Sequence, residues 1–192
     1  MNIIKRLFDV ICSAIALVVL CPLFLVIAIF IKCDSTGPVI YRQQRLGRLA
    51  KPFTILKFRT MYENAETDTP LLSNKDDKRI TKFGCLLRKY HLDELPQLWN
   101  ILVGDMSFVG PRPERKYFVD QLLVIAPEYV KLFKVRPGLS SWGSVKYGYA
   151  SDLSQMVERM KYDLMYLDKM SLAIDIKIMA YTIKTVVTGK GV

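Results

Sequence analysis

The most continuous hydrophobic pattern in the chain runs from Val10 to Ile31, where 22 residues carry no charge and Ser13 is the single conventional polar side chain. As one straight helix this segment would measure about 33 Å, enough for a bilayer core of about 30 Å. Pro22 interrupts it, because proline cannot donate a hydrogen bond to the Val18 carbonyl and its ring crowds that turn. The pattern therefore predicts a helix that kinks at Pro22.

A kink leaves two arms of about 18 and 15 Å, and each is too short to cross a bilayer alone. Lys5 and Arg6 precede the segment, and basic residues also follow it: Lys32, Arg42, Arg45, Arg48 and Lys51. The positive-inside rule then favours the cytoplasm for both ends. We predict a re-entrant membrane helix over residues 1–33 and one cytoplasmic domain over 34–192. A single span that tolerates its proline is the alternative.

The rest of the chain alternates short extended segments with helical patterns. VIYRQQRLG and PFTILKFRTM, joined around Gly47, predict two strands. Apolar spacing predicts helices over 80–90, 93–104, 115–125, after Pro127, from 151 or 152, and over 171–188. Asp93 is expected to cap the second of these helices, and residues 62–78 are expected to form a loop or short helix over the site. The predicted fold class is α/β, helix-dominated with a small sheet.

The last two predicted helices carry apolar faces that fit either of two surroundings. One face of the first helix carries Leu153, Met156, Val157, Met160 and Leu164. One face of the second helix carries Leu172, Ile176, Met179, Ile183 and Val186. Packing in a protein core explains such faces, and so does docking as amphipathic helices at a membrane surface. We expect core packing and keep the membrane surface as the alternative.

Charge is unevenly distributed over a chain with a net charge of +10. The window from Tyr41 to Thr60 holds six Lys or Arg residues and no acid. Beside a membrane helix, anionic lipid or a phosphorylated substrate explains this better than nucleic acid, and a solvated basic face is the plain alternative. The four cysteines, at 12, 21, 33 and 85, form no CxxC pair, which indicates a reducing compartment and disfavours a zinc site.

Asp93 and Glu94 are the most informative pair for chemistry. Acidic residues at a helix start can simply complement the helix dipole. They can also act as a nucleophile toward phosphorus, or hold a hard cation such as Mg²⁺ that brings phosphates with it. The one histidine, His91, either orients this pair or is incidental.

Arg112 lies between Pro111 and Pro113, whose fixed dihedrals suit a rigid phosphate clamp or a braced turn. Arg136-Pro137-Gly138 repeats the arrangement ahead of Trp142, whose ring could stack on a base or pack.

Four motifs in order carry a family resemblance: KFRTM (57–61), HLDELPQLWNIL (91–102), GDMSFVGPRP (104–113) and VRPGLSSWG (135–143). Together with KRLFDV and the proline-broken helix, they resemble the small monotopic phosphoglycosyl transferases, bacterial sugar transferases that start glycoconjugate assembly. One departure is Cys21-Pro22, where members of that family commonly have Ser-Pro. A thiol bonds more weakly than a hydroxyl, which affects how the carbonyls at the kink are satisfied.

The resemblance implies transfer of a phosphosugar from a UDP-sugar to polyprenyl phosphate at the cytoplasmic face of the bacterial inner membrane, with Mg²⁺ as cofactor and UMP as product. By the same match, Asp93 would be the nucleophile and a metal ligand, and Glu94 would assist it. Arg112 would contact phosphate, and Lys57, Arg59 and Arg136 are further candidates for binding substrate.

Two other classes of function stay open at this point. One is a membrane-anchored scaffold or lipid-binding protein without enzymatic activity, and the other is a membrane-bound nucleotide hydrolase. The sequence does not identify the sugar, the glycan pathway or the oligomeric state, and a homodimer is compatible with it.

Overall fold

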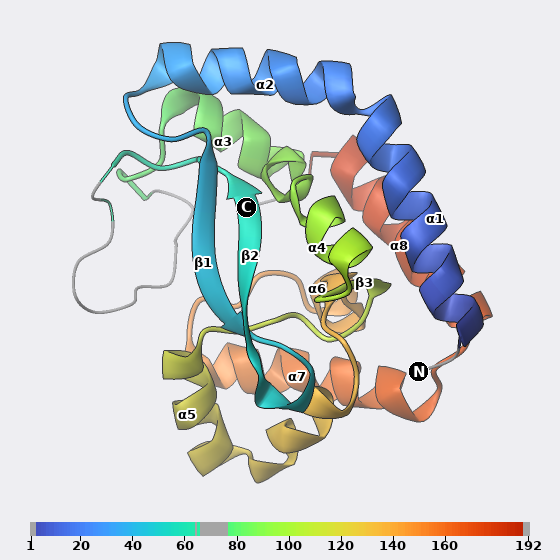
Figure 1. The fold of residues 1–192 in the computed structure, drawn as a ribbon. Helices are drawn as coiled ribbons and strands as arrows, with labels where there is room; N and C mark the ends of the chain where they lie inside the picture. The colour runs from blue at the N-terminus through green and yellow to red at the C-terminus, as the bar shows by residue number, and fades with distance from the viewer. Residues whose placement is uncertain (1–2, 64, 66–76, 190–192) are drawn as a thin grey trace.

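The computed structural model describes residues 3–63, 65 and 77–189 (Figure 1). Most of the loop predicted over residues 62–78 lies outside the described residues. Helices dominate the fold, and the strands form two separate two-stranded sheets. The prediction of a helix-dominated fold with a small sheet is therefore confirmed, and the predicted sheet is the first of the two. The second sheet was not predicted.

The apolar N-terminal segment forms two helices, α1 (Ile3–Val19) and α2 (Cys21–Asp34), bent by 60°. Pro22 stands in the first turn of α2, where its missing N–H costs no helical hydrogen bond of that helix. Figure 1 shows α2 across the top and α1 descending at its side. None of the described helices is long and apolar enough by itself to cross a membrane, whereas the bent pair is when taken together. The predicted kink is confirmed.

Lys5 and Arg6 do not flank the helix, as the sequence suggested, but belong to α1 and point into the protein. The Lys5 amine donates to the Val109 carbonyl at 3.0 Å and pairs with Asp175. The Arg6 guanidinium donates to the carbonyls of Ile101 at 2.6 Å and Leu102 at 2.8 Å. These two charges therefore attach α1 to the rest of the fold, and the membrane topology inferred from them stays a prediction.

The first sheet is the predicted hairpin. Strands β1 (Ile40–Leu46) and β2 (Pro52–Phe58) pair antiparallel around the short 3-10 helix η1 (Arg48–Ala50). The second sheet pairs β3 (Ser107–Val109) parallel to β4 (Gly138–Ser140). The sequence predicted no strand in either segment, because three residues are too few to show alternation. The two segments approach so closely that a Cβ atom on Gly138 would lie 2.1 Å from the backbone nitrogen of Gly110.

Two helices join the hairpin to the second sheet. The Thr81 hydroxyl caps α3 (Lys82–Lys89), whose tight contact with the end of β2 depends on Gly84, since a Cβ there would lie 2.2 Å from the Thr60 carbonyl oxygen. The chain then passes through the 3-10 helix η2 (Leu92–Glu94) into α4 (Gln97–Val103). Gly104, at φ +103°, ends α4 as the sequence predicted.

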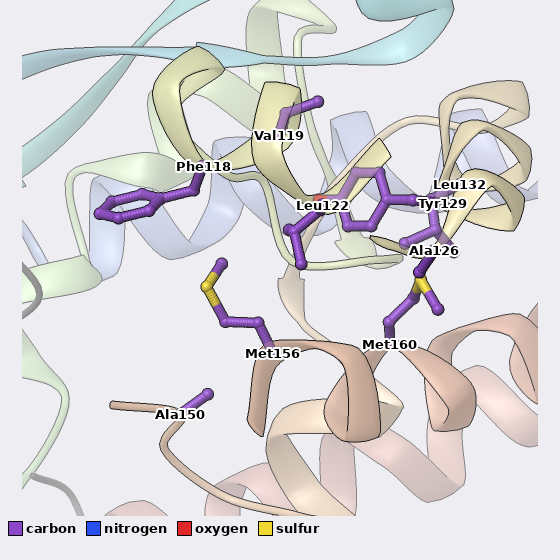
Figure 2. Packing of buried hydrophobic residues seen from close by; sticks show 9 residues of the cluster. All are labelled: Phe118, Val119, Leu122, Ala126, Tyr129, Leu132, Ala150, Met156 and Met160. Atoms are coloured by element: carbon purple, nitrogen blue, oxygen red, sulfur yellow. The ribbon is translucent and has the colours of Figure 1, made fainter. Parts of the chain in front are cut away.

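The main hydrophobic core lies in the C-terminal half. Helix α5 (Lys116–Ile125) and the 3-10 helix η3 (Pro127–Lys134) pack on α7 (Leu153–Asp168), and Figure 2 shows the side chains that they bury together. Met156 and Met160 are in this cluster, so the predicted core face of α7 is confirmed.

The two helices not yet described are α6 (Trp142–Lys146), which precedes α7, and α8 (Leu172–Val187), which follows it. Helix α8 buries Asp175 and Ile178, but Ile176 and Ile183 are 53% and 63% exposed. Core packing was therefore the wrong prediction for that face of α8, because the side of the helix that meets the protein is offset from its most apolar side.

Candidate active site

The Asp93-Glu94 pair lies in η2, between α3 and α4. His91, just before this pair, has a left-handed backbone conformation at φ +52°. Asp93 is not the N-cap of the following helix: α4 begins at Gln97, Pro96 precedes it, and no side chain caps it. The predicted cap was wrong because the chain is already helical at Leu92, so Asp93 lies inside a turn.

Glu94 is held by two cations from distant parts of the chain. Its Oε1 accepts a hydrogen bond from Lys57 Nζ of β2 at 2.8 Å and another from Arg112 Nη2 at 3.0 Å. Burial alone would raise the pKa of Glu94, but the charges of Lys57 and Arg112 outweigh burial and hold that pKa far below its ordinary value. Glu94 is therefore an anion that fixes two cations in place.

Asp93 has the opposite surroundings, although it is the next residue. It is 7% exposed, and its carboxylate accepts no hydrogen bond from the described part of the chain. Burial raises its pKa and the neighbouring Glu94 adds to that rise, while Lys57, Arg88 and His91 oppose it. The Asp93 oxygens are thus available to an incoming group, beside a cluster of cations.

The Pro111–Pro113 turn that presents Arg112 is anchored from behind. Glu114 Oε1 accepts from Arg159 Nη2 of α7 at 2.5 Å, and Glu114 Oε2 accepts from Arg45 Nη1 of β1 at 3.2 Å. Glu94 and Glu114 both raise the pKa of Arg112, the former more strongly. Arg112 is therefore permanently charged and set on a braced loop.

Two of the predicted substrate-binding residues are directed elsewhere. The buried Arg59 guanidinium donates to the carbonyls of Ile31 at 3.3 Å and Ser35 at 2.7 Å, at the carboxyl end of α2. Arg136 Nε donates to the Gly104 carbonyl at 2.6 Å, at the carboxyl end of α4. Both positions suit a cation, since the helix dipole is negative there. Lys57 and Arg112, in contrast, meet Glu94 as expected of one site.

Arg88 of α3 was missed by the sequence reasoning. Its Nε donates to Thr60 Oγ1 at 2.9 Å, and its charge lowers the pKa of Asp93. The only local signal was its position in the last turn of a helix that ends before the acidic pair. Trp142, for which stacking on a base was considered, packs with Tyr181 and Lys146.

The chemistry of the donor set fits a hard cation. Asp93 has both oxygens available and Glu94 retains Oε2, so the donors are oxygens alone. No cluster of three or more His, Cys, Asp or Glu residues occurs in the described ranges. The Asp93-Glu94 pair is of the kind that suits Mg²⁺, which commonly takes one or two carboxylates together with substrate phosphates. The arrangement as a whole, an available carboxylate beside fixed cations, suits a phosphorylated substrate.

Comparison with known proteins agrees with a site for a phosphorylated substrate. The family described as bacterial sugar transferase matches residues 1–189. The chain is 42% identical to the UDP-N-acetylgalactosamine-undecaprenyl-phosphate N-acetylgalactosaminephosphotransferase of Aeromonas hydrophila over 98% of this chain and 44% of that protein. It is 38% identical to the UDP-glucose:undecaprenyl-phosphate glucose-1-phosphate transferase of Caulobacter vibrioides over 96% of this chain and 70% of that protein.

A third relative matches almost end to end. The exopolysaccharide production protein PSS of Rhizobium leguminosarum is 35% identical over 98% of both chains. The chain spans less than half the length of the Aeromonas protein and of a related transferase from Klebsiella pneumoniae. With the family match over nearly every residue, the chain belongs to the bacterial sugar transferase family.

Proposed function

We propose that the chain transfers a phosphosugar from a UDP-sugar to polyprenyl phosphate, giving polyprenyl diphosphate sugar and UMP, and so initiates glycoconjugate synthesis. The observation that carries the proposal is the buried Asp93 carboxylate, which has no hydrogen-bond donor in the described chain and lies beside the Lys57–Glu94–Arg112 cluster. The activities after which the Aeromonas hydrophila and Caulobacter vibrioides relatives are named support the same reaction class.

In the first half-reaction, an Asp93 oxygen attacks the phosphorus that carries the sugar. The bond from that phosphorus to the oxygen of UMP breaks, UMP leaves, and Asp93 carries the phosphosugar as an acyl phosphate. Lys57 and Arg112, already fixed on Glu94, face the added negative charge without having to reorganise. Asp93 and Glu94 would hold Mg²⁺, which supplies charge neutralisation on the phosphates.

In the second half-reaction, a phosphate oxygen of the lipid acceptor attacks the same phosphorus. The bond to Asp93 breaks and its carboxylate is restored. Because a covalent intermediate separates the two halves, the kinetics should be ping-pong.

A lipid acceptor requires a membrane, and the exposed apolar surface supports one. Helix α1 exposes Leu7, Ile11, Ile15 and Val18, and α2 exposes Leu25 and Ile29. We propose that the bent pair enters one leaflet of the bacterial inner membrane from the cytoplasmic face, as a monotopic anchor, and that the exposed face of α8 lies along the headgroups.

The test is a single-turnover experiment. Purified enzyme with UDP-sugar and Mg²⁺, without lipid acceptor, should release about one equivalent of UMP and gain the mass of a phosphosugar on the peptide containing Asp93. Asp93→Asn should remove both signals, because a neutral amide is a poor nucleophile. Asp120→Asn, at an exposed carboxylate paired with Lys116, is the matched control and should keep both.

Other outcomes separate the competing classes of protein. Continued UMP release without an acceptor identifies a nucleotide hydrolase, and no UMP under any condition identifies a scaffold. A mass adduct on Glu94, or a requirement for lipid before any UMP is released, would refute Asp93 as the nucleophile.

A further inference from the structure

A stripe of buried polar side chains continues along α4 from the active site. Asp93, Gln97 and Asn100 are spaced by four and three residues, and the backbone stays right-handed helical through the two residues between η2 and α4, so they share one face. The Asn100 side chain shows where this face points: its amide accepts from the Leu56 nitrogen at 3.0 Å and donates to the Thr54 carbonyl at 2.8 Å. The stripe therefore faces β2.

Gln97 is the member of the stripe without an explanation. It is 2% exposed, and its Nε2 has no hydrogen-bond partner in the described chain. Asn100, one turn further, has both ends of its amide bonded. A buried donor left unpaired is destabilising, and such groups are rare in folded proteins. The amide of Gln97 is thus costly for folding and available for a ligand.

The position of Gln97 identifies the ligand chemistry. It lies one helical turn beyond Asp93 and three residues beyond Glu94, on the face directed at β2. Lys57, the neighbour of Leu56 in β2, is bonded to Glu94 at this same place. The group that must bind between these side chains is the phosphoryl group that Asp93 attacks, which is rich in acceptor oxygens.

We infer that Gln97 is a further catalytic residue, whose Nε2–H donates a hydrogen bond to a non-bridging oxygen of the phosphoryl group in transfer. The inference rests on the proposed function. Charge on those oxygens changes as the bonds to phosphorus change, and a donor already held in a buried site stabilises it without reorganisation. Lys57 and Arg112 supply charge, and Gln97 supplies a neutral, directed donor.

The first test is Gln97→Met, which keeps the length of the side chain and removes the donor. The rate of the UMP burst should fall about 100-fold, as for a lost oxyanion donor, with kcat and kcat/KM reduced together. The melting temperature should stay the same or rise, because an unpaired buried donor has been removed. Asn100→Leu is the matched control: it breaks two bonds to β2 and should lower the melting temperature.

The second test is Gln97→Glu, which keeps shape and polarity. As an anion it repels the phosphoryl oxygens, and when protonated it can donate an O–H in place of the amide. The burst rate of this variant, relative to wild type, should therefore recover as pH falls. A structural role for Gln97 predicts no such reversal.

An unchanged burst in Gln97→Met would overturn the inference, since a buried water could then satisfy the amide. A fall in melting temperature like that of Asn100→Leu, without pH recovery in Gln97→Glu, would overturn it in favour of packing. Failure of the proposed function looks different: the wild-type enzyme itself would give no burst and no adduct on Asp93, and the inference would fall with it.

Discussion

At the scale of single residues, the site separates two neighbouring carboxylates by their surroundings. Glu94 receives two cations on one oxygen, and Asp93 receives none by direct contact. The pKa of Glu94 is lowered and that of Asp93 is raised, the latter first by burial. Groups of the same chemical type thereby have different states: Glu94 is a fixed anion, and the Asp93 carboxylate is available for the nucleophilic role that we propose for it.

This separation predicts the pH dependence of the burst. In the proposed mechanism the nucleophile is the Asp93 carboxylate, so the burst rate should fall as pH is lowered through the Asp93 pKa, which lies above its ordinary value of 3.8. Lys57→Met removes the cation that most strongly opposes the rise and should move the acid limb to higher pH. Burst rates measured by rapid quench between about pH 4 and 8 would check this.

Lys116→Met, at an exposed pair with Asp120, serves as the control and should leave the acid limb in place. A burst rate that is independent of pH down to the ordinary range of aspartate would contradict the raised pKa of Asp93.

At the scale of elements, the proposed membrane topology rests on the bend between α1 and α2. Leu20 lies at the break: its nitrogen still donates to the Ala16 carbonyl, and its carbonyl accepts from Phe24, each at 2.9 Å. Pro22 cannot donate to the Val18 carbonyl, so the helix axis changes direction there. Helices of 17 and 14 residues measure about 25 and 21 Å, which is short for a span of about 30 Å.

Terminal tags should therefore report both ends of the wild-type chain in the cytoplasm. Pro22→Leu restores the donor to Val18 and should straighten the pair, so that part of the population spans the membrane with its N-terminus in the periplasm. Accessibility of the tags in intact cells measures this distribution. Cys21→Ser is the neighbouring control and should be tolerated.

A wild-type N-terminal tag in the periplasm would contradict the re-entrant arrangement. The contacts of α1 sharpen this test, because Lys5 and Arg6 bond to the folded domain and a fully spanning helix would have to break those bonds.

At the scale of the whole molecule, the two ends of the chain close on each other. Lys5 pairs with Asp175, 170 residues away, and Tyr166 donates to the same carboxylate at 2.6 Å. Asp9, also on α1, accepts from Ser107 and from the Phe108 nitrogen, each at 3.1 Å. Helix α1, which exposes apolar side chains to the outside, is thus held by buried polar contacts on its inner side. Strand β3 contacts both α1 and Tyr166 of α7.

Lys5→Met should consequently destabilise the protein by about 3–5 kcal/mol, because it leaves the buried Asp175 carboxylate without its cation. Chemical unfolding in detergent measures the change. The double variant Lys5→Met/Asp175→Asn should recover part of the loss, since no buried charge remains unpaired. Lys116→Met breaks an exposed pair and should change stability by less than about 1 kcal/mol. Equal losses of stability in Lys5→Met and Lys116→Met would contradict a structural role for the Lys5–Asp175 pair.

The sequence by itself determined the features that depend on neighbours within one or two turns. Pro22 sets the bend, the β-branched and aromatic residues within 39–61 favour the β1–β2 hairpin, and Gly104 ends α4. The acidic pair and the Pro-Arg-Pro turn were recognisable as motifs for the same reason, because each consists of consecutive residues in the chain.

Only the tertiary structure decided which charges meet. Arg59 and Arg136 resemble Lys57 and Arg112 in type and setting, yet the first two bond helix carbonyls and the last two bond Glu94. The same holds for the burial of Asp93, the unpaired amide of Gln97 and the pairing of β3 with β4. Each results from contacts between segments far apart in the chain, where burial and the distance between charges set the energy, and no local pattern encodes those distances.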